Sequence, residues 1–246
     1  MKILENAGYK FAVSNALEAF RVRTLLTKEP GTIKWLEELR TGDVFYDIGA
    51  NIGIYSILAA KAVGESGDVY AVEPHVASAA ALLRNAALNN VASRVFLLTQ
   101  ALHSRHDGAV TFNYTHLDPG TSGSQLGHTR SESGEEYVPK AVEIKRAVTV
   151  DHLAWLGLRP PCMIKIDVDG NELEILRGMR ETMYGSQLRS VQVEVHPNDA
   201  GEINQLMAQR GFMISEKHYT ALGQQRLDKG VPPQNITHNM IFRRAA

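Results

Sequence analysis

An acidic residue and a glycine turn follow one of the short apolar runs of this sequence. Asp47 comes directly after residues 44–46, and the turn Gly49-Ala-Asn-Ile-Gly53 leads into residues 54–63, which have the composition of a helix. A strand, a glycine turn and a helix start together form a nucleotide-binding corner. Glycine lets a ligand come close to the backbone, and the helix start offers unpaired N–H groups.

The chemistry of this corner favours a nucleoside without phosphates. Asn51 stands where the dinucleotide fingerprint has its middle glycine, and no Gly-Lys-Ser or Gly-Lys-Thr follows to make a phosphate loop. The carboxylate of Asp47 would repel a diphosphate and suits a ligand that carries an amino group or a sulfonium. Glu73 ends the next predicted strand, where an acidic side chain can accept hydrogen bonds from both ribose hydroxyls.

Two further predicted strands carry polar side chains on one face, because side chains alternate along a strand. These side chains are Lys165, Asp167 and Asp169 in and directly after residues 162–168, and Gln192, Glu194 and His196 in and directly after residues 190–195. Neighbouring strands of a doubly wound sheet bind ligands beyond their carboxyl ends. We therefore expect a polar cluster there, made of Lys165, Asp167, Glu194 and His196.

The polar cluster allows more than one role for its members. A buried lysine must be paired or neutral, and Asp167 or Glu194 could be the partner of Lys165. Carboxylates and an imidazole could also bind Mg²⁺ or Mn²⁺ that bridges an acceptor diol. Lys165 on the same face argues against a metal, because its ammonium already supplies the positive charge, and we assign no metal ligand.

The elements that must position these residues alternate along the chain, which is typical of βαβ units in a parallel sheet with right-handed crossovers. Predicted strands are residues 44–46, 67–74, 94–99, 162–168, 190–195, 211–215 and 238–243, and predicted helices are residues 54–63, 76–89, 171–177 and 202–210. We expect one domain over residues 1–246, with a helical N-terminal cap over residues 1–40.

Residues 103–150 interrupt this alternation. Two extended segments, residues 109–114 and 141–148, enclose a long polar stretch rich in Gly and Ser. A loop of that length in a compact domain is usually a functional lid or a disordered segment. Both readings stay open, and a lid that orders when a ligand binds would satisfy both.

The composition of the chain is that of an ordinary soluble protein. The formal net charge is −1 and there is no basic block, so charge does not favour nucleic acid or an anionic membrane as a partner. One cysteine, Cys162, rules out a disulfide framework within the chain and suits a reducing compartment. With no signal-like start and no long apolar run, we expect a cytoplasmic protein.

Four motifs together resemble the FkbM family of S-adenosylmethionine-dependent methyltransferases. They are Asp47-Ile-Gly-Ala-Asn-Ile-Gly53, Val72-Glu-Pro74, Thr149-Val-Asp-His-Leu153, and the segment from Ile164 to Gly178 that contains Lys165-Ile-Asp-Val-Asp-Gly170. The resemblance implies the Rossmann-like class I methyltransferase fold, an α/β fold with a doubly wound seven-stranded sheet and an antiparallel last strand. It also implies O-methylation of a hydroxyl on a small acceptor such as a sugar or secondary metabolite.

The resemblance also implies where the cofactor would lie. Asp47, Gly49, Asn51 and Gly53 would line the methionine end of S-adenosylmethionine, Glu73 the ribose, and Gln100 and Ala101 the adenine. The chain departs from the family pattern at Asp169, where a glutamate is more usual, and this shorter side chain puts a role at longer reach in doubt.

Methyl transfer to a hydroxyl needs alignment of the reacting atoms and removal of the hydroxyl proton. Asp167, His196 or a Lys165 of lowered pKa could be the base. Alternatively, Lys165 and Glu194 form a structural ion pair and only positioning matters. A cofactor-binding scaffold or regulator without catalysis is the alternative function, and the polar cluster argues against it.

Overall fold

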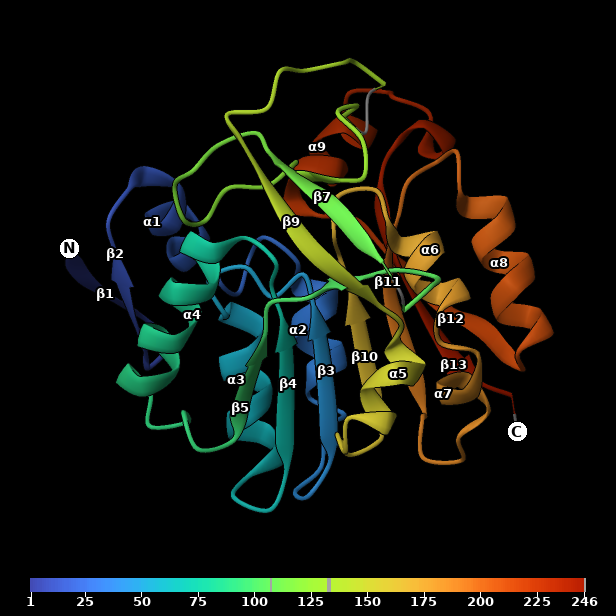
Figure 1. Ribbon diagram of the computed structural model, residues 1–246, viewed down its shortest axis with the longest axis horizontal. Coiled ribbons are helices and arrows are strands. Elements are labelled where there is room, and N and C mark those ends of the chain that lie inside the picture. The colour runs from blue at the N-terminus through green and yellow to red at the C-terminus, as the bar shows by residue number, and fades with distance from the viewer. Residues whose placement is uncertain (107, 132–133, 246) are drawn as a thin grey trace.

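The computed structural model describes residues 1–106, 108–131 and 134–245. Its centre is a seven-stranded sheet (Figure 1). In spatial order the strands are β12 (Phe212–His218), β13 (His238–Arg244), β11 (Ser190–Val195), β10 (Met163–Ile166), β3 (Val44–Ile48), β4 (Asp68–Val72) and β5 (Val95–Leu98). β13 runs antiparallel to both of its neighbours, and the other pairs are parallel. The predicted doubly wound sheet with an antiparallel last strand is therefore confirmed.

The direction in which the chain adds strands reverses between β3 and β10, which are neighbours. From β3 the chain proceeds outward to β4 and β5, and after β10 it proceeds outward the other way to β11. In open α/β sheets the crevice for a ligand lies at such a reversal, beyond the carboxyl ends of the strands. This places the glycine turn after β3 and the polar residues after β10 at the same point.

Helices cover both faces of the sheet and bury one apolar cluster on each. On one face α2 (Pro30–Leu36), α3 (Ile54–Val63) and α4 (Val76–Leu88) pack over Phe45, Val69 and Met163. On the other, α5 (Val150–Trp155), α6 (Glu172–Arg177), α7 (Arg180–Tyr184) and α8 (Ala200–Gln209) pack over Tyr46, Ile164 and Val191. The alternating strand pattern is thus satisfied on both sides, and the ligand edge stays free of these layers.

The prediction of a helical cap over residues 1–40 is wrong for its first part. β1 (Lys2–Asn6) and β2 (Tyr9–Val13) form an antiparallel hairpin, and Ala7 and Gly8 turn it with φ of 51° and 80°. Helices follow as expected, α1 (Ala16–Arg23) and then α2, which ends at Leu36. α1 begins with a capping box, because Asn15 and Glu18 satisfy each other's backbone N–H groups.

Residues 103–150 contain both predicted strands, β7 (Ala109–Tyr114) and β9 (Ala141–Val148), paired antiparallel. Two short strands extend this second sheet, β8 (Gln125–Leu126) beside β7 and β6 (Ala101–Leu102) beside β9. Figure 1 shows β7 and β9, in green and yellow-green, crossing beyond the upper end of the central sheet, where the parallel strands end.

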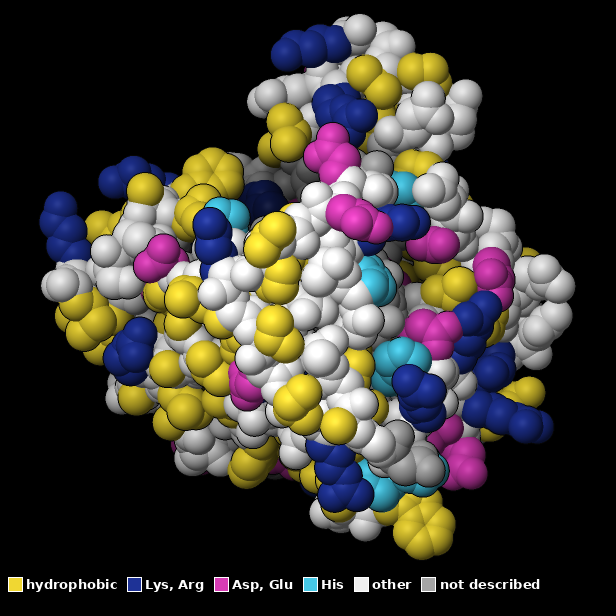
Figure 2. Space-filling model, turned by 45° about the horizontal axis from the view of Figure 1, so that its top comes forward, with side chains coloured by type: hydrophobic (Ala, Val, Ile, Leu, Met, Phe, Trp, Pro, Cys, Tyr) yellow, Lys and Arg dark blue, Asp and Glu magenta, His cyan; other side chains and the backbone are white. Residues whose placement is uncertain are grey.

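The chain after β12 folds into α9 (Ala221–Asp228) and a short 3₁₀ turn, Pro233–Asn235, before it enters β13. Figure 2 turns the ligand edge of the sheet toward the reader and shows charged side chains of both signs interspersed there with histidine and hydrophobic ones. In the described residues no helix is both long and apolar enough to cross a membrane.

Candidate active site

The glycine turn after β3 leaves no room for a side chain. Gly49 has φ of 85°, and a Cβ on it would lie 1.7 Å from the carbonyl oxygen of Asp167. The N–H groups of Gly49 and Ala50 both donate to the carbonyl of Val72, at 2.9 and 3.0 Å. Only glycine lets β3, β4 and β10 meet this closely, so the turn brings residues of three strands to one place.

Glu73, just after β4, is bound to the same turn. One carboxylate oxygen accepts the N–H of Asn51 and the other accepts the N–H of His75, both at 2.7 Å. Burial raises the pKa of Glu73 to about 7, although these hydrogen bonds act in the opposite direction. Each oxygen keeps a second lone pair, and the side chain lines a cavity, so it can still accept hydrogen bonds from a ligand.

Asp47 lies beneath the turn and is not among the residues that line the cavities. Its side chain is fully buried, and one oxygen accepts the hydroxyl of Ser56 at 2.5 Å. The other oxygen has no hydrogen-bond partner among the described residues. Burial raises the pKa of Asp47, and the neighbouring Lys165 opposes that shift.

The buried Lys165 and the partly buried Asp167 form an ion pair at the end of β10. The lysine Nζ lies 2.6 Å from a carboxylate oxygen of Asp167 and 4.9 Å from the centre of the Tyr55 ring. Burial disfavours both charges, yet their attraction raises the pKa of Lys165 and lowers that of Asp167. The pair is therefore ionised, and Asp167 is held as a weak base.

Glu194 on β11 lines the same cavity as Asp167, Asp169 and Glu73, which we call the central cavity. Its carboxyl has no hydrogen-bond partner in the part of the chain that the structure describes. Burial raises the pKa of Glu194 well above its usual value, and the charges of Asp167 and Asp169 add to the shift. Asp169 differs, because one of its carboxylate oxygens accepts the N–H of Gly123 at 2.7 Å.

His196 does not join this group. β11 ends at Val195, and His196 lies in the following loop, where its Nδ1 accepts the N–H of Asn198 at 3.3 Å. It lines a separate groove, described below. The structure therefore brings Lys165, Asp167 and Glu194 together and corrects the expectation that His196 lies with them.

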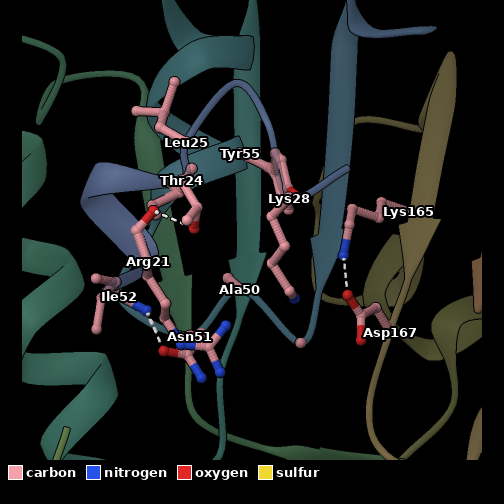
Figure 3. Close-up of a pocket in the computed structure, with 12 residues that line it drawn as sticks. Arg21, Thr24, Leu25, Lys28, Ala50, Asn51, Ile52, Tyr55, Lys165 and Asp167 are labelled. Carbon is pink, nitrogen blue, oxygen red and sulfur yellow. Dashed lines mark hydrogen bonds and ion pairs between the residues drawn. The ribbon is translucent and has the colours of Figure 1, made fainter. Parts of the chain in front are cut away.

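Two cations that sequence reasoning missed reach into the site from the N-terminal segment. Arg21 on α1 and Lys28 after it line the cavity of Glu73 and Glu194. They also line a second cavity, which lies between α1 and the glycine turn. Figure 3 shows them extending toward the turn at Ala50 and Asn51, with the Lys165–Asp167 pair on the opposite side. The sequence of α1 could not predict that Arg21 lines the site. The helix contains two arginines, and only the fold shows which of them faces the cavity.

The loop between β7 and β8 closes over the turn and is held by hydrogen bonds. Nε of Arg21 donates to the carbonyl of Gly120 at 2.7 Å, and the amide of Asn51 donates to the carbonyl of Thr121 at 2.8 Å. Nε2 of Gln125, at the start of β8, donates to the carbonyl of Asp169, also at 2.7 Å. This loop forms the outer wall of the cavity that Glu73 lines.

Gln100 and Ala101 line a third cavity, which shares Gly49 and Pro74 with the cavity at Glu73. Its other lining is mostly apolar, with Ile48, Val72, Leu102, Phe112, Leu126, Val168 and Ile175. Oε1 of Gln100 is buried and has no partner among the described residues. An apolar slot with one unsatisfied acceptor suits a flat heterocycle with an amino group.

The three adjoining cavities and the sheet order define a class I S-adenosylmethionine-dependent methyltransferase. The donor set fits the cofactor, with a heterocycle slot, a carboxylate for ribose hydroxyls, cations for a carboxylate, and acids around the place of a sulfonium. Acidic side chains line the central cavity. Among the described residues, however, no group of three His, Cys, Asp or Glu side chains is placed so that it could hold a metal ion.

The chain belongs to the FkbM methyltransferase family, since the model of the methyltransferase FkbM domain matches residues 47–214. The hexuronic acid methyltransferase AglP of Haloferax volcanii is 27% identical over 211 residues, which are 84% of this chain and 80% of that protein. The 31-O-demethyl-FK506 methyltransferase FkbM of Streptomyces tacrolimicus is 30% identical over 205 residues, 72% of this chain and 75% of that protein.

Solved structures agree on the fold. An rRNA-methylase described as putative, from Clostridium thermocellum, superposes with a TM-score of 0.55 at 9% identity, over 89% of this chain and 97% of that one. The methyltransferase FkbM of Methylobacillus flagellatus gives 0.51 at 14% identity, over 94% of this chain and 56% of that one. The predictions of family, fold, enzyme class and cofactor are confirmed, and the roles of individual site residues stay predictions.

Proposed function

We propose that this protein transfers the methyl group of S-adenosylmethionine to a hydroxyl of a small acceptor, a sugar or a secondary metabolite. Two relatives support this acceptor class, because their names describe methylation of a hexuronic acid and of the 31-O position of FK506. The observation that carries the proposal is Glu194, a carboxyl without a hydrogen-bond partner that lines the central cavity and has a raised pKa.

The proposed binding residues follow the three cavities. Gln100 and Ala101 would contact the adenine and Glu73 the ribose hydroxyls. Gly49, Asn51 and Gly53 would shape the backbone around the methionine part. Asp47 would act from beneath the turn, since it lines no cavity, and would hold Lys165 in place by charge.

Arg21 and Lys28 would bind the carboxylate of the methionine part. In the described residues Arg21 has no ion pair, and its guanidinium is half-buried beside Asn51. Nζ of Lys28 lies 2.8 Å from a carboxylate oxygen of Glu29, and the side chain also lines the central cavity. Cations fixed near a carboxylate in a partly buried site form strong hydrogen bonds.

S-adenosylmethionine supplies a methyl group on a positively charged sulfur. The central cavity is lined by Glu73, Asp167, Asp169 and Glu194. The ionised Asp167 would attract the sulfonium, and the sulfonium would in turn favour the charged form of the other three acids. The backbone of the turn would orient the bound molecule. Alignment of this kind lowers the activation barrier of methyl transfer by several kcal/mol.

Glu194 is the proposed general base that takes the proton of the acceptor hydroxyl. The ion pair with Lys165 makes Asp167 a weak base, Lys165 is held in its charged form, and His196 lies in another groove. A base is most effective when its pKa lies near the working pH, and burial shifts Glu194 in that direction.

The substitution Glu194→Gln tests this proposal. An acceptor is first identified by incubating the enzyme with labelled cofactor and a metabolite extract and characterising the labelled product. We expect Glu194→Gln to lower kcat by about 10²–10⁴-fold, and to leave the calorimetric Kd for S-adenosylhomocysteine within about twofold. The matched control is Glu65→Gln, an exposed residue outside the cavities. Full activity of Glu194→Gln would remove Glu194 as the base, and no labelled product from any hydroxyl compound would contradict O-methylation itself.

A further inference from the structure

A wide groove lies beside the central cavity, on the other side of Asp169. One wall consists of residues 125, 128–131 and 136 of the insertion, and the other is the loop after β11 with His196, Asn198 and Asp199; we call this space the outer groove. It has a volume of about 540 Å³ and is open to solvent. Binding sites for small molecules are commonly about 300–1,000 Å³, so the outer groove can hold a ligand larger than a simple alcohol.

The side chains that line the outer groove are polar or charged. Among the described residues that line it there is no aliphatic or aromatic hydrocarbon side chain. The cavity at Gln100 differs, since Ile48, Val72 and Phe112 line it, and Leu25, Ile52 and Ile54 line the cavity between α1 and the glycine turn. The cavities assigned to the cofactor therefore carry hydrocarbon side chains, and the described lining of the outer groove carries none.

Two histidines of the outer groove present fixed donors. Nδ1 of His196 accepts the N–H of Asn198, and Nδ1 of His128 accepts the N–H of Arg130, both at 3.3 Å. A ring nitrogen that accepts a hydrogen bond carries no proton, so in the neutral ring Nε2 carries it and can donate. The amides of Asn198 and Gln125 and the carboxylate of Asp199 add further donors and acceptors.

Such a lining discriminates between ligands. An apolar ligand would strip water from amides, imidazoles and carboxylates without replacing the lost hydrogen bonds, which is costly for each group. A ligand with many hydroxyls replaces those bonds one by one. The outer groove is therefore complementary to polyhydroxylated compounds and not to apolar macrocycles.

The outer groove also adjoins the proposed base. Asp169 lines both the outer groove and the central cavity, and His196 follows Glu194 by two residues at the end of β11. The two spaces therefore adjoin at Asp169, and a hydroxyl of a bound molecule would have to pass this residue to reach Glu194.

We propose that the outer groove binds the methyl acceptor and that the acceptor is a polyhydroxylated, sugar-like molecule. This inference rests on the proposed methyl transfer to a hydroxyl. His196 and Asn198 act as acceptor-binding residues that hold the sugar, and they have no part in binding the cofactor.

The test uses the full-length enzyme and two panels of acceptors with labelled S-adenosylmethionine. One panel holds methyl hexopyranosides and methyl hexuronopyranosides, and the other holds macrolactones that carry free hydroxyls. We expect transfer to a member of the first panel. With that acceptor, His196→Leu and Asn198→Leu should each raise KM about tenfold, as expected for the loss of a hydrogen bond in a bound complex. The calorimetric Kd for S-adenosylhomocysteine should stay within about twofold. His106→Leu, at an exposed histidine that lines none of the cavities described above, is the matched control.

The outcomes separate the two proposals. Transfer to macrolactones and not to glycosides overturns the acceptor class and leaves the methyltransferase proposal standing. Unchanged KM in both leucine variants, or an equal rise in the Kd for S-adenosylhomocysteine, overturns the role of the outer groove. No transfer to either panel by protein that binds S-adenosylhomocysteine overturns the proposed hydroxyl chemistry, and the acceptor class with it.

Discussion

At the scale of single residues, the site is defined by acids whose charges the fold treats differently. Asp167 is ionised by its pair with Lys165, whereas burial raises the pKa values of Glu73 and Glu194. Groups whose pKa values are driven apart in one cavity commonly mark the place of catalysis. On this ground we propose that Asp167 supplies charge and that Glu194 exchanges the proton.

Glu73 has a consequence for the stability of the ligand-free protein. Its pKa is about 7 in the folded protein against an ordinary value of 4.5, so folding favours the neutral form. The stability that the neutral Glu73 contributes to the folded protein is fully present below about pH 4.5 and is lost as the pH rises through about 7. Between pH 4.5 and 8 the free energy of unfolding should therefore fall. In Glu73→Gln this fall should be smaller by about 2 kcal/mol, because the amide does not titrate.

Urea unfolding at a series of pH values measures this effect. A part of the slope persists in the variant, because Glu172 is also buried with a pKa of about 8. Glu37→Gln, on an exposed side chain, should leave the slope unchanged. An identical pH profile for Glu73→Gln and the unmodified protein would show that Glu73 stays charged in the fold.

At the scale of elements, sequence reasoning located the strands of the sheet but not everything that surrounds the site. β7, β9, β11 and α3 match their predicted ranges, because each has a clear period or clear bounding residues. The β1–β2 hairpin was missed because its turn is Ala7-Gly8 and not the Asn-Gly or Asp-Gly pair that signals a tight turn.

The polar residues at strand ends show where the alternation rule stops working. Lys165 lies within β10 and Glu194 within β11, and both face the predicted side. His196 lies past the end of β11, and Asp169 has φ of 61°, so strand geometry no longer directs these two side chains. Arg21 could not be predicted at all, because its position depends on contact with Gly120, far along the chain.

α1 and the loop after β7 meet at Arg21, which leads to a prediction about cofactor affinity. Arg21→Ala should weaken binding of S-adenosylhomocysteine about tenfold or more, because a hydrogen bond to a charged group is lost. Binding of 5′-methylthioadenosine, which lacks the carboxylate, should change by less than about twofold.

Calorimetry with both ligands gives the comparison, and Arg23→Ala, an exposed arginine of the same helix, is the control. Equal losses for the two ligands would mean that Arg21 acts by holding the loop at Gly120 and not by contact with a carboxylate.

At the scale of the whole molecule, one buried asparagine joins the N-terminal hairpin to the site. Asn85 on α4 accepts the N–H of Ala12 and donates to the carbonyl of Ile52, both at 2.9 Å. Ala12 belongs to β2 and Ile52 to the glycine turn, so a single side chain connects two parts of the chain that are far apart in sequence.

Asn85→Ala leaves both of these buried backbone groups without a partner. We expect a loss of about 2–6 kcal/mol in the free energy of unfolding, at about 1–3 kcal/mol for each group, and weaker binding of S-adenosylhomocysteine. Urea unfolding measures the first and calorimetry the second. Arg84→Ala, its exposed neighbour on the same helix, should change neither quantity. A loss below about 0.5 kcal/mol would show that the hairpin is not coupled to the turn.

β13 lies between β11 and β12, although it follows both of them in the sequence. During synthesis β11 and β12 therefore emerge first and must wait with unpaired edges until β13 inserts between them. Exposed strand edges can pair with other chains, and pairings distant in sequence form slowly. The strand order thus makes the interval before β13 emerges the period in which the nascent chain is most exposed to aggregation and most dependent on chaperones.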